Sequence, residues 1–556
     1  MFKYKKNSNF TICFVIITVL ISCKENKFLQ TEKWSSKSSV IFEDFDNKIL
    51  SLKIDNEKST SKIVEVQKGK SIEVNFKKDE KYSGIKIQPK KKIILSSGQN
   101  YSLVFDAKSV GTETTFLTVY VENGKGERVR RITNIDTGDF KSYFFELTTN
   151  QTDINSGLRD IPIAWKTKAT HMKINGLLYK IDFSEVAAID FYRLEGLKDK
   201  TILIDNIRIV ESPERDPNFL VGLADKFGQN AKKDFPIKVH SDKQLKEIAD
   251  KELKALREYT LMPDRCKYGG WIDGPNLKPT GFFRKEKVNG KWGLVDPDGH
   301  LYFSIGLANV RMANSTTYTG IDYTDENLYH INPEDVTPED SKGIIEIPKK
   351  TMKTARVVNK LRRDMFLELP KLDDPLSKHY SYRKESHFGP IEHGQTFSFY
   401  RANLERRYGE ETKNSFFDKW LEVTENRMRN WGFTSFGNWI DPAFYHRNNL
   451  PYFANGWIIG DFQKIYSGAD YWGPMPDPFD PEFEKRAKKS IDVVSEEVKN
   501  NPWCMGVFID NERSWGNEGS IKAHYGLVLD GLSKGKESYL KQEFMTILKA
   551  KHKSIT

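Results

Sequence analysis

The stretch DPEFEKRAKKSIDVVSEEVKNNPWCMGVFIDNE, residues 480–512, predicts the fold class of the second half of the chain. Asp480 and Pro481 are typical of the N-cap and first turn of a helix, and the apolar residues that follow recur at helical spacing. Asn-Asn-Pro at 500–502 ends this pattern, and the apolar run 503–509 is typical of a strand. A helix that leads directly into a strand is the repeat of a parallel α/β sheet.

The same alternation of helix and strand recurs earlier in the chain. Helical spacing predicts helices over 243–262 and 414–431, and apolar runs predict strands over 301–308 and 433–439. The polar stretch 310–412 shows no clear period and is typical of a long functional or flexible loop. The second half of the chain is therefore predicted to be an α/β domain of the (β/α)8 (TIM) barrel type.

Residues 40–212 have a different period. Apolar and polar residues alternate, as in TFLTVYVENGKGERVRRI (115–132), which places two strands around the turn pair Asn123-Gly124. This alternation predicts an N-terminal β-sandwich. Its last strand, which contains IDNIRI (204–209), resembles that of the carbohydrate-binding jelly rolls of many glycosidases. Sugar binding and a purely structural role both stay open for this domain.

Residues 1–22 are expected to be a signal peptide rather than part of the fold. Lysines precede an apolar run that is too short to span a bilayer, and Leu-Ile-Ser-Cys at 20–23 resembles a bacterial lipobox. We expect cleavage before Cys23, lipid attachment to its thiol, a polar tether over 23–39, and a protein anchored in the cell envelope at the bacterial outer membrane. An ordinary signal peptide and an uncleaved anchor are the alternatives.

The composition narrows the possible functions. The 87 Lys and Arg against 77 Asp and Glu give a formal charge of +10, which is mild for 556 residues, and no basic stripe indicates a nucleic-acid partner. Of four cysteines, only Cys266 and Cys504 fall in the predicted folded part, and no CxxC or other metal-ligand spacing is present. The sequence therefore predicts no metal site, no cofactor and no disulfide framework.

Polar and aromatic residues follow three of the predicted strands. The carboxyl ends of the strands form the active-site face of a parallel barrel, so these residues are expected to meet at one rim. Indole rings stack on the C–H faces of sugars, while amides and carboxylates bind the hydroxyl groups. The rim predicts a carbohydrate ligand. Its predicted substrate-binding residues are Asn438, Trp439, Asn511 and Trp515.

Glu512 is the candidate catalytic acid at this rim. A carboxylic acid donates a proton to a glycosidic oxygen if its surroundings keep it protonated, and Phe508 and Trp515 are expected to supply apolar surroundings. A solvated loop residue or an N-cap partner is the alternative. Two interpretations, contact with sugar or an ordinary structural role, stay open for His446, Trp457 and Trp472. A bound cation is an alternative for Asp477 and Asp480, although helix capping fully explains Asp480.

Three segments resemble the glycoside hydrolase family 50 β-agarases: WGLVDPDGHLYFSIG (292–306), WGFTSFGNW (431–439) and NPWCMGVFIDNERSWG (501–516). The resemblance implies a β-sandwich followed by a (β/α)8 barrel, and retaining hydrolysis of β-1,4 bonds in agarose or a related red-algal galactan. In that family's clan the acid/base Glu follows an Asn at the end of the fourth barrel strand. Asn511 and Glu512 match this pair.

The resemblance also implies a nucleophile that this sequence does not contain, because in this clan the second carboxylate comes from the seventh strand. We expect residues 213–556 to be the N-terminal part of a barrel, with an open sheet edge, and the chain alone to be inactive or unstable. The first functional hypothesis is a shortened, lipid-anchored β-agarase. The second is a membrane-tethered carbohydrate-binding protein without catalysis.

Overall fold

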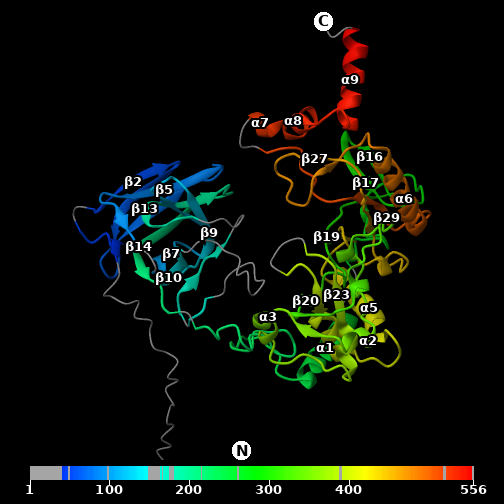
Figure 1. Ribbon diagram of the computed structural model, residues 1–556, viewed down its shortest axis with the longest axis horizontal. Coiled ribbons are helices and arrows are strands. Elements are labelled where there is room, and N and C mark those ends of the chain that lie inside the picture. The colour runs from blue at the N-terminus through cyan, green and yellow to red at the C-terminus, as the bar shows by residue number, and fades with distance from the viewer. Residues whose placement is uncertain are drawn as a thin grey trace, which may run out of the picture. The chain divides into compact units, whose positions relative to one another are not determined.

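The computed structural model describes residues 40–47, 50–96, 99–147, 163–165, 167–174, 181–214, 216–258, 262–386, 391–517 and 521–553. The chain divides into two compact units, 1–152 with 160–217 and 153–159 with 218–556, drawn from blue to cyan and from green to red in Figure 1. Cys23, the predicted signal peptide and the predicted tether lie outside the described residues. In the part of the chain that is described, no helix is long and apolar enough to cross a membrane.

The first unit consists of two seven-stranded sheets. One sheet has the order β11-β10-β7-β14-β4-β3, with β1 beside β14, and the other has the order β12-β9-β8-β13-β5-β2, with β6 beside β13. All pairs are antiparallel except β10 with β11. The strands of the first sheet are β1 (Val40–Glu43), β3 (Ser59–Glu65), β4 (Lys70–Phe76), β7 (Tyr101–Ser109), β10 (Lys141–Glu146), β11 (Thr170–His171) and β14 (Lys200–Glu211). Those of the second are β2 (Leu52–Glu57), β5 (Tyr82–Pro89), β6 (Ile93–Ile94), β8 (Thr115–Asn123), β9 (Arg128–Ile135), β12 (Lys173–Ile174) and β13 (Glu185–Leu194).

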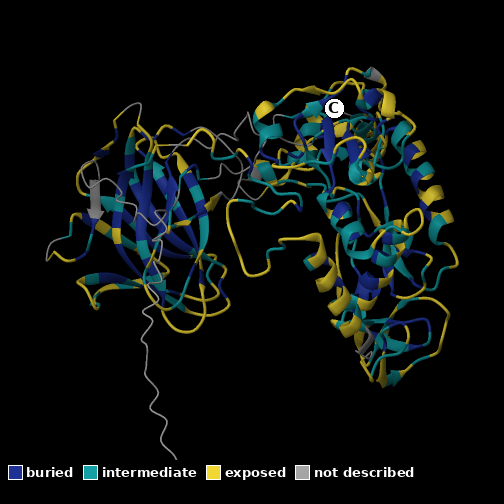
Figure 2. Ribbon diagram, turned by 90° about the horizontal axis from the view of Figure 1, so that it is seen from below, coloured by how far each residue is buried: buried dark blue, intermediate teal, exposed yellow. Residues whose placement is uncertain are grey.

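Alternating apolar residues from both sheets form a single core. On β7 and β8, Leu103, Phe105, Leu117 and Val119 are fully buried in this core, and Figure 2 shows the same burial along most strands of the unit. The prediction of an N-terminal β-rich domain is confirmed. One detail differs: between β8 and β9 the left-handed backbone is at Gly126 (φ 81°) rather than at Gly124.

The second unit begins with helix α1 (Asp242–Glu258) and a four-stranded antiparallel sheet of order β15-β18-β17-β16. Its strands are β15 (Trp271–Asn276), β16 (Arg284–Val288), β17 (Lys291–Val295) and β18 (His300–Tyr302). The predicted strand over 301–308 is in fact two strands, β18 and β19 (Gly306–Leu307), because the chain leaves one sheet and enters another between them.

Four short parallel strands follow one another across this unit. β19 pairs in parallel with β25 (Ser435–Phe436), and β26 (Tyr452–Gly456) pairs in parallel with β29 (Cys504–Ile509). The backbone N–H of Phe436 donates to the carbonyl of Pro451 over 2.8 Å, which places β25 beside β26. The row β19-β25-β26-β29 is the part of an α/β sheet that the described residues contain. The complete (β/α)8 barrel stays a prediction.

The two predicted amphipathic helices precede strands of this row. They are α5 (Ser415–Asn430) and α6 (Pro481–Val498), and the Asp480 side chain accepts from the backbone N–H of Glu482 as the predicted N-cap. Trp420 and Val494 from these helices pack in one core with Phe444, Tyr452 and Trp503. The strand pair β27 (Lys464–Ile465) and β28 (Met475–Pro476) lies between β26 and α6 in the chain. Helices α7 (Ile521–His524), α8 (Gly526–Ser533) and α9 (Tyr539–His552) follow β29.

The prediction that 310–412 is a long loop is wrong. This segment contains a three-stranded sheet of order β20-β24-β23 and a small aromatic core that includes Tyr323, Tyr382 and Phe397. Its strands have two to four residues, which is too short to produce a visible period. The elements are β20 (Thr317–Tyr318), β21 (Ile321–Asp322), β22 (Arg356–Val357), β23 (Tyr380–Arg383), β24 (Gly394–Phe397), α2 (Lys349–Met352), α3 (Lys360–Asp364) and α4 (Phe399–Tyr408).

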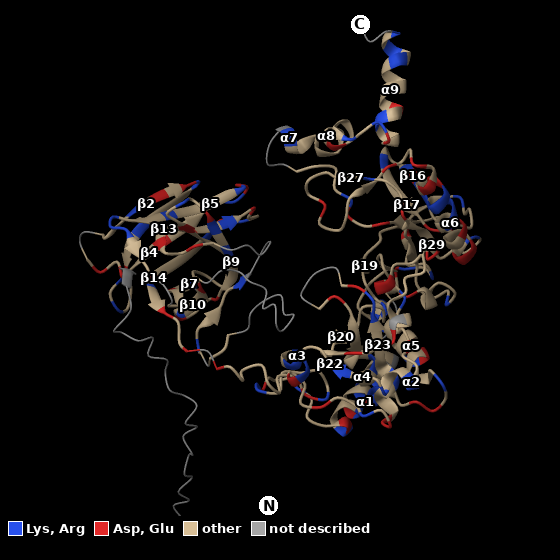
Figure 3. Cartoon of the chain, viewed as in Figure 1, with Lys and Arg blue, Asp and Glu red and all other residues tan. Residues whose placement is uncertain are grey.

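Charges of both signs are interspersed over each unit. Figure 3 shows Lys and Arg beside Asp and Glu along the helices and loops rather than in blocks of one sign. Many of these residues form ion pairs within the chain, for example Arg427 with Glu252 at 2.6 Å and Arg447 with Glu425 at 2.7 Å. Among the described residues, charges of both signs are therefore mixed over the surface of each unit.

Candidate active site

The parallel row brings the polar loops that follow its strands to one edge. After β19 and β25, the backbone N–H of Asn309 donates to the carbonyl of Asn438 over 2.8 Å. After β26 and β29, the N–H of Asp510 donates to the carbonyl of Gly456 over 3.0 Å. The strands are parallel within each pair, and the hydrogen bonds between β25 and β26 advance in the same direction along both strands, so the carboxyl ends of all four lie on one side. The loops that carry Asn438 and Glu512 therefore belong to the same edge of the row.

A side chain from β26 joins the two strand pairs at this edge. The Asn455 carbonyl oxygen accepts a hydrogen bond from the backbone N–H of Trp439 over 3.1 Å. Neither β26 nor Asn455 was predicted from the sequence. The segment PYFANG, 451–456, is only six residues long and shows no regular alternation of apolar and polar residues, although its side chains alternate between buried and half-buried in the structure.

Glu512 is exposed, and its carboxylate is held by a tryptophan. The indole Nε1 of Trp472, in the segment between β27 and β28, donates to Glu512 Oε2 over 2.6 Å. Trp472 is 41% exposed, and its ring meets that of Tyr471 edge to face at 4.8 Å. Trp515 is 77% and Phe508 43% exposed, so within the described residues these two side chains do not enclose Glu512 as expected. The described polar contact of Glu512 is the hydrogen bond from Trp472, and Glu512 is exposed to solvent.

Asp510 fixes the loop on which Glu512 stands. Its Oδ1 accepts from the backbone N–H of Ile458 over 3.0 Å, and its Oδ2 lies 3.8 Å from Nε of Arg513. Burial raises the pKa of the Asp510 carboxyl above its usual range, against the opposing effects of Ile458 and Arg513. These contacts tie the end of β29 to the segment that follows β26.

Left-handed backbone occurs after three of the four strands. Asn309 (φ 65°), Trp439 (φ 54°), Asp510 (φ 57°) and Glu512 (φ 43°) have positive φ although none is glycine. Such conformations are disfavoured for residues with a Cβ atom, and they cluster where the surrounding structure must hold a side chain in place for function. The strand-end loops are therefore the most constrained part of this edge.

The remaining candidate residues differ in their surroundings. Asn438, Trp439 and Asn511 are half-buried, whereas Trp515 extends into solvent. His446 is exposed, as the solvated-loop interpretation requires. Asp477 and Asp480 are buried acceptors of backbone N–H groups, including those of Leu540 and Glu482, so capping explains both carboxylates without a cation.

Comparison with known proteins places this geometry in a family. Residues 44–220 match the agarase CBM like domain. The chain superposes on the structure of an exo-β-agarase with a TM-score of 0.88 and 43% sequence identity, covering 93% of this chain and 71% of that one. The chain belongs to the glycoside hydrolase family 50 β-agarases. PfGH50B superposes with a TM-score of 0.81 and 38% identity, covering 91% of this chain and 69% of that one. The agarase AgWH50C superposes with a TM-score of 0.79 and 36% identity, covering 93% of this chain and 70% of that one.

Two curated β-agarases from Vibrio sp. (strain JT0107) are longer than this family 50 chain. β-Agarase B is 37% identical over 469 residues, which are 82% of this chain and 47% of the relative. β-Agarase A is 29% identical over 442 residues, 76% of this chain and 40% of the relative. The chain therefore spans about half the length or less of these two relatives.

The sandwich of this family 50 chain carries a second group of polar and aromatic side chains. On β13, Ile189 and Phe191 point into the core, so Asp190 and Tyr192 lie on the opposite face of the sheet. The ring of Tyr192 meets those of Tyr82 and Tyr120, from β5 and β8, at 6.5 and 6.3 Å. We call these residues, with Asp190, the tyrosine face.

Asp190 is the unusual member of the tyrosine face. It is 1% exposed, and neither carboxylate oxygen makes a hydrogen bond within the described residues, although Nη1 of Arg128 lies 3.4 Å from Oδ2. Burial raises the pKa of Asp190 to about 6. Asp190 is therefore a buried carboxyl group beneath the tyrosine face, with an ion-pair partner in Arg128.

Proposed function

We propose that this chain carries the acid/base part of a retaining β-agarase active site, with Glu512 as the acid/base residue. The observation that carries the proposal is the position of Asn511-Glu512 at the carboxyl end of β29. Counted along the row β19-β25-β26-β29, this strand is the fourth. It corresponds to the family's fourth barrel strand if the row is the beginning of a (β/α)8 barrel. We therefore propose that residues 213–556 form the N-terminal part of such a barrel.

In the proposed reaction, Glu512 acts twice. It first donates its proton to the glycosidic oxygen while a second carboxylate attacks the anomeric carbon, so that the sugar–oxygen bond breaks and a glycosyl-enzyme ester forms. Ionised Glu512 then takes a proton from water, and that water displaces the ester with net retention of configuration. Because Trp472 occupies Oε2 of Glu512, the proposal assigns the proton transfer to Oε1.

The proposed nucleophile is not a residue of this chain. Retaining glycosidases place their two carboxyl groups about 5–5.5 Å apart. This chain covers 71% of the exo-β-agarase structure, and we assign the nucleophile to the remaining part of the family's fold. The chain joined to that part is called the extended chain below.

The proposed substrate is the β-1,4-linked chain of agarose or of a related red-algal galactan. Trp439 and Trp515 would supply indole surfaces for the C–H faces of the sugar rings, and Asn438 and Asn511 would bind hydroxyl groups. The exposure of Trp515 supports this role, because a stacking surface must be accessible before the ligand arrives. The family and its agarase CBM like domain support a galactan ligand in general.

We also propose that the mature protein is anchored by lipid on Cys23, after removal of residues 1–22, and that residues 23–39 tether the sandwich (40–212) to the bacterial outer membrane. The support is the sequence alone, with Leu-Ile-Ser-Cys at 20–23. Incorporation of labelled fatty acid into the chain, and its loss in Cys23→Ser, would test this proposal. An equal label in Cys23→Ser would contradict it.

The decisive experiment measures release of reducing ends from agarose. The extended chain should release them, Glu512→Gln should reduce the rate at least about 100-fold, as for loss of a general acid, and Glu411→Gln, at an exposed glutamate of another surface, should leave it unchanged. The anomeric configuration of the first product, followed by proton NMR, should be retained. Undiminished turnover by Glu512→Gln, or sugar release by the present chain alone, would contradict the assignment.

A second function, non-catalytic carbohydrate binding by the sandwich, is favoured by the tyrosine face. Tyr82, which is 43% exposed, and the half-buried Tyr120 offer stacking surfaces, and the buried Tyr192 packs against both rings. Affinity electrophoresis in agarose gels would separate the two functions. Retardation that is lost in Tyr120→Ala but kept in Glu512→Gln would indicate binding by the sandwich.

A further inference from the structure

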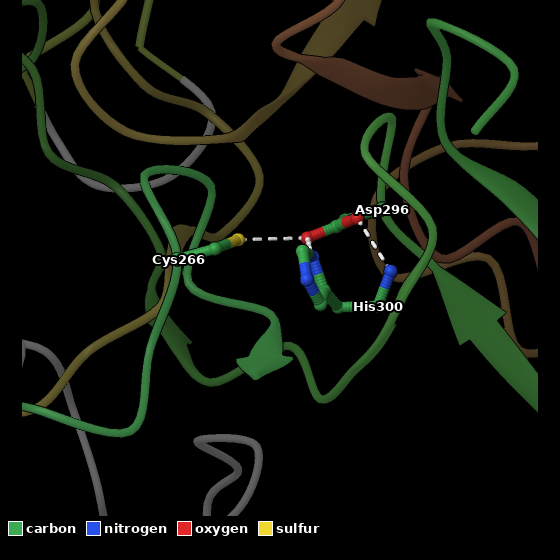
Figure 4. A group of neighbouring side chains, drawn as sticks. All are labelled: Cys266, Asp296 and His300. Atoms are coloured by element: carbon green, nitrogen blue, oxygen red, sulfur yellow. Dashed lines mark hydrogen bonds and ion pairs between the residues drawn. The ribbon is translucent and has the colours of Figure 1, made fainter. Parts of the chain in front are cut away.

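A cysteine, an aspartate and a histidine meet in the second unit, away from the loops that carry Glu512. Sγ of Cys266 lies 2.8 Å from Oδ2 of Asp296, and Nδ1 of His300 lies 3.4 Å from the same oxygen (Figure 4). One ligand atom from each residue lies within 4.8 Å of the others. The sequence analysis predicted no metal-ligand cluster because thirty-odd residues separate Cys266 from the other two.

The cluster lies near the amino end of β25, whereas the candidate active site lies at its carboxyl end. Tyr302, which follows His300 in β18, donates its hydroxyl proton to the carbonyl of Thr434 over 2.7 Å, and Thr434 directly precedes β25. Asn438 and Trp439 follow the same strand. The cluster therefore belongs to neither the proposed catalytic edge nor the tyrosine face.

Asp296 is held so that one oxygen faces both other side chains. It is fully buried, and its Oδ1 accepts the backbone N–H groups of Asp298 and His300 at 3.0 and 2.9 Å. This leaves Oδ2 directed at the thiol and the imidazole. Nδ1 of His300 is buried and makes no hydrogen bond within the described residues. An imidazole nitrogen that makes no hydrogen bond, beside a carboxylate and a thiol, is available as a metal ligand.

In the structure the Cys266 thiol donates its proton to Oδ2 of Asp296. A divalent cation would displace this proton to solvent and take its place between sulfur and oxygen. A thiolate, a carboxylate and a neutral imidazole balance the two positive charges of such a cation, so the buried site would carry no net charge.

We propose that Cys266, Asp296 and His300 bind Zn²⁺ through Sγ, Oδ2 and Nδ1, with water as the fourth ligand. Zinc takes thiolate, imidazole and carboxylate ligands at about 2.3, 2.0–2.1 and 2.0–2.2 Å in a tetrahedral arrangement. These bond lengths place the oxygen and nitrogen about 3.4 Å apart, as they already are. Sulfur and oxygen must separate from 2.8 Å to about 3.6 Å, and sulfur and nitrogen must also lie about 3.6 Å apart, so the Cys266 side chain shifts when the ion binds.

The ligand set selects zinc over the hard cations. Ca²⁺ and Mg²⁺ prefer sites built from oxygen atoms, whereas thiolate and imidazole together favour zinc. The bound ion would join the segment before β15 to the turn between β17 and β18, which no disulfide joins, since Cys266 is a free thiol. The proposed role is a cross-link that stabilises this end of the second unit.

The test uses the full chain, stripped of metal with a chelator and then equilibrated with zinc chloride. We expect one zinc per chain by elemental analysis, and the same in Cys504→Ser, which removes the other described free thiol. Cys266→Ser and His300→Gln should each weaken zinc binding at least tenfold. Zinc should raise Tm in the unsubstituted chain and in Cys504→Ser, but not in Cys266→Ser.

Cobalt gives an independent signal that does not depend on stability. Co²⁺ in this site should produce the intense absorption of a cobalt–thiolate bond, and Cys266→Ser should lose it. Folding of each variant is checked by circular dichroism, and His300→Gln keeps the test valid if Cys266→Ser does not fold. Absence of stoichiometric zinc, absence of the thiolate absorption, or an equal loss of both in Cys504→Ser would each overturn the proposal and leave a hydrogen-bonded thiol.

Discussion

Trp472 donates its indole N–H to the carboxylate of Glu512 over 2.6 Å, although forty positions separate the two residues in the chain. The contact joins the loop after β29 to the segment between β27 and β28, and it fixes one oxygen of the proposed acid/base residue. A donor on one carboxylate oxygen limits rotation of the group, so the other oxygen keeps a constant direction. Positioning of this kind matters most in the transition state.

The first prediction concerns this hydrogen bond. Trp472→Phe keeps an aromatic ring but removes the donor, and a hydrogen bond to a charged group is worth about 1.5 kcal/mol at the lower end, or roughly tenfold in rate. We expect kcat of the extended chain on agarose to fall about tenfold with little change in KM. Trp431→Phe, at a 59% exposed residue that ends α5, is the control and should have no effect. A larger change in KM than in kcat would indicate that Trp472 contacts substrate instead.

The sequence predicted those parts of the fold that have long, regular periods. α6 begins at the predicted Pro481, where Asp480 caps it, and α5, which buries an apolar face, differs from its prediction by one residue at each end. The apolar stripe expected on α6 is not continuous, because its buried residues are Arg486, Ser490 and Val494, and Ile491 is 54% exposed. β26 has five residues between loops, and the strands within 310–412 have two to four, so no period forms. Glu512 was recognised through its neighbour Asn511 and a family pattern.

The hydrogen-bond partners of the candidate residues could not be predicted from the sequence. Trp472 reaches Glu512, and Cys266 reaches Asp296, only through the tertiary fold. Spacing rules detect ligands that share one helix or one turn, as Asp296 and His300 do. They do not detect a third ligand from a separate segment, and a lone cysteine carries no signal of its own.

The second prediction concerns the pH dependence of the sandwich. Burial raises the pKa of Asp190 from 3.8 to about 6, so the folded state binds this proton more tightly than the unfolded state. The contribution of protonated Asp190 to the free energy of unfolding is fully present below about pH 4. It falls as the pH rises from about 4 to 6, and it is absent above about pH 6. Asp190→Asn, which is always neutral, should therefore raise Tm at pH 7 but have little effect at pH 4.

The control residue for this prediction is Asp199, whose pKa is shifted in the opposite direction. The backbone N–H of Lys78, and then the Lys77 side chain, hold the pKa of Asp199 below its usual range. The contribution of the Asp199 carboxylate to stability is present at neutral pH. It is lost as the pH falls below 3.8, which is the ordinary pKa of an aspartate. Asp199→Asn should thus lower Tm slightly at pH 7. An effect of Asp190→Asn that is the same at pH 4 and pH 7 would contradict the assignment of a raised pKa.

The third prediction concerns the core beneath the row of strands. Trp420 is 1% exposed, packs on Phe417 and Phe444, and donates its indole N–H to the hydroxyl of Tyr400 over 2.9 Å. Trp420→Ala leaves a cavity and an unpaired hydroxyl, and should lower the free energy of unfolding by about 3–5 kcal/mol. Urea denaturation followed by tryptophan fluorescence measures this change. Trp431→Ala, at an exposed position, should cost less than about 0.5 kcal/mol, and similar costs for the two variants would show that the buried cluster does not stabilise the unit.

The last prediction concerns the outer strands of the row. Val507, Phe508 and Ile509 on β29 are each more than 40% exposed, as are Ile305 and Leu307 at β19, and each strand has one ladder partner among the described residues. Exposed apolar strands with unpaired edges associate with other chains. We expect light scattering to show concentration-dependent association of the full chain. Val507→Lys should reduce this association several-fold, because pairing of two strands would remove the lysine charge from water. Val493→Lys, at a partly exposed valine on α6, should leave it unchanged. A chain that stays monomeric at every concentration, or equal effects of the two lysines, would show that these strands are not the associating surface.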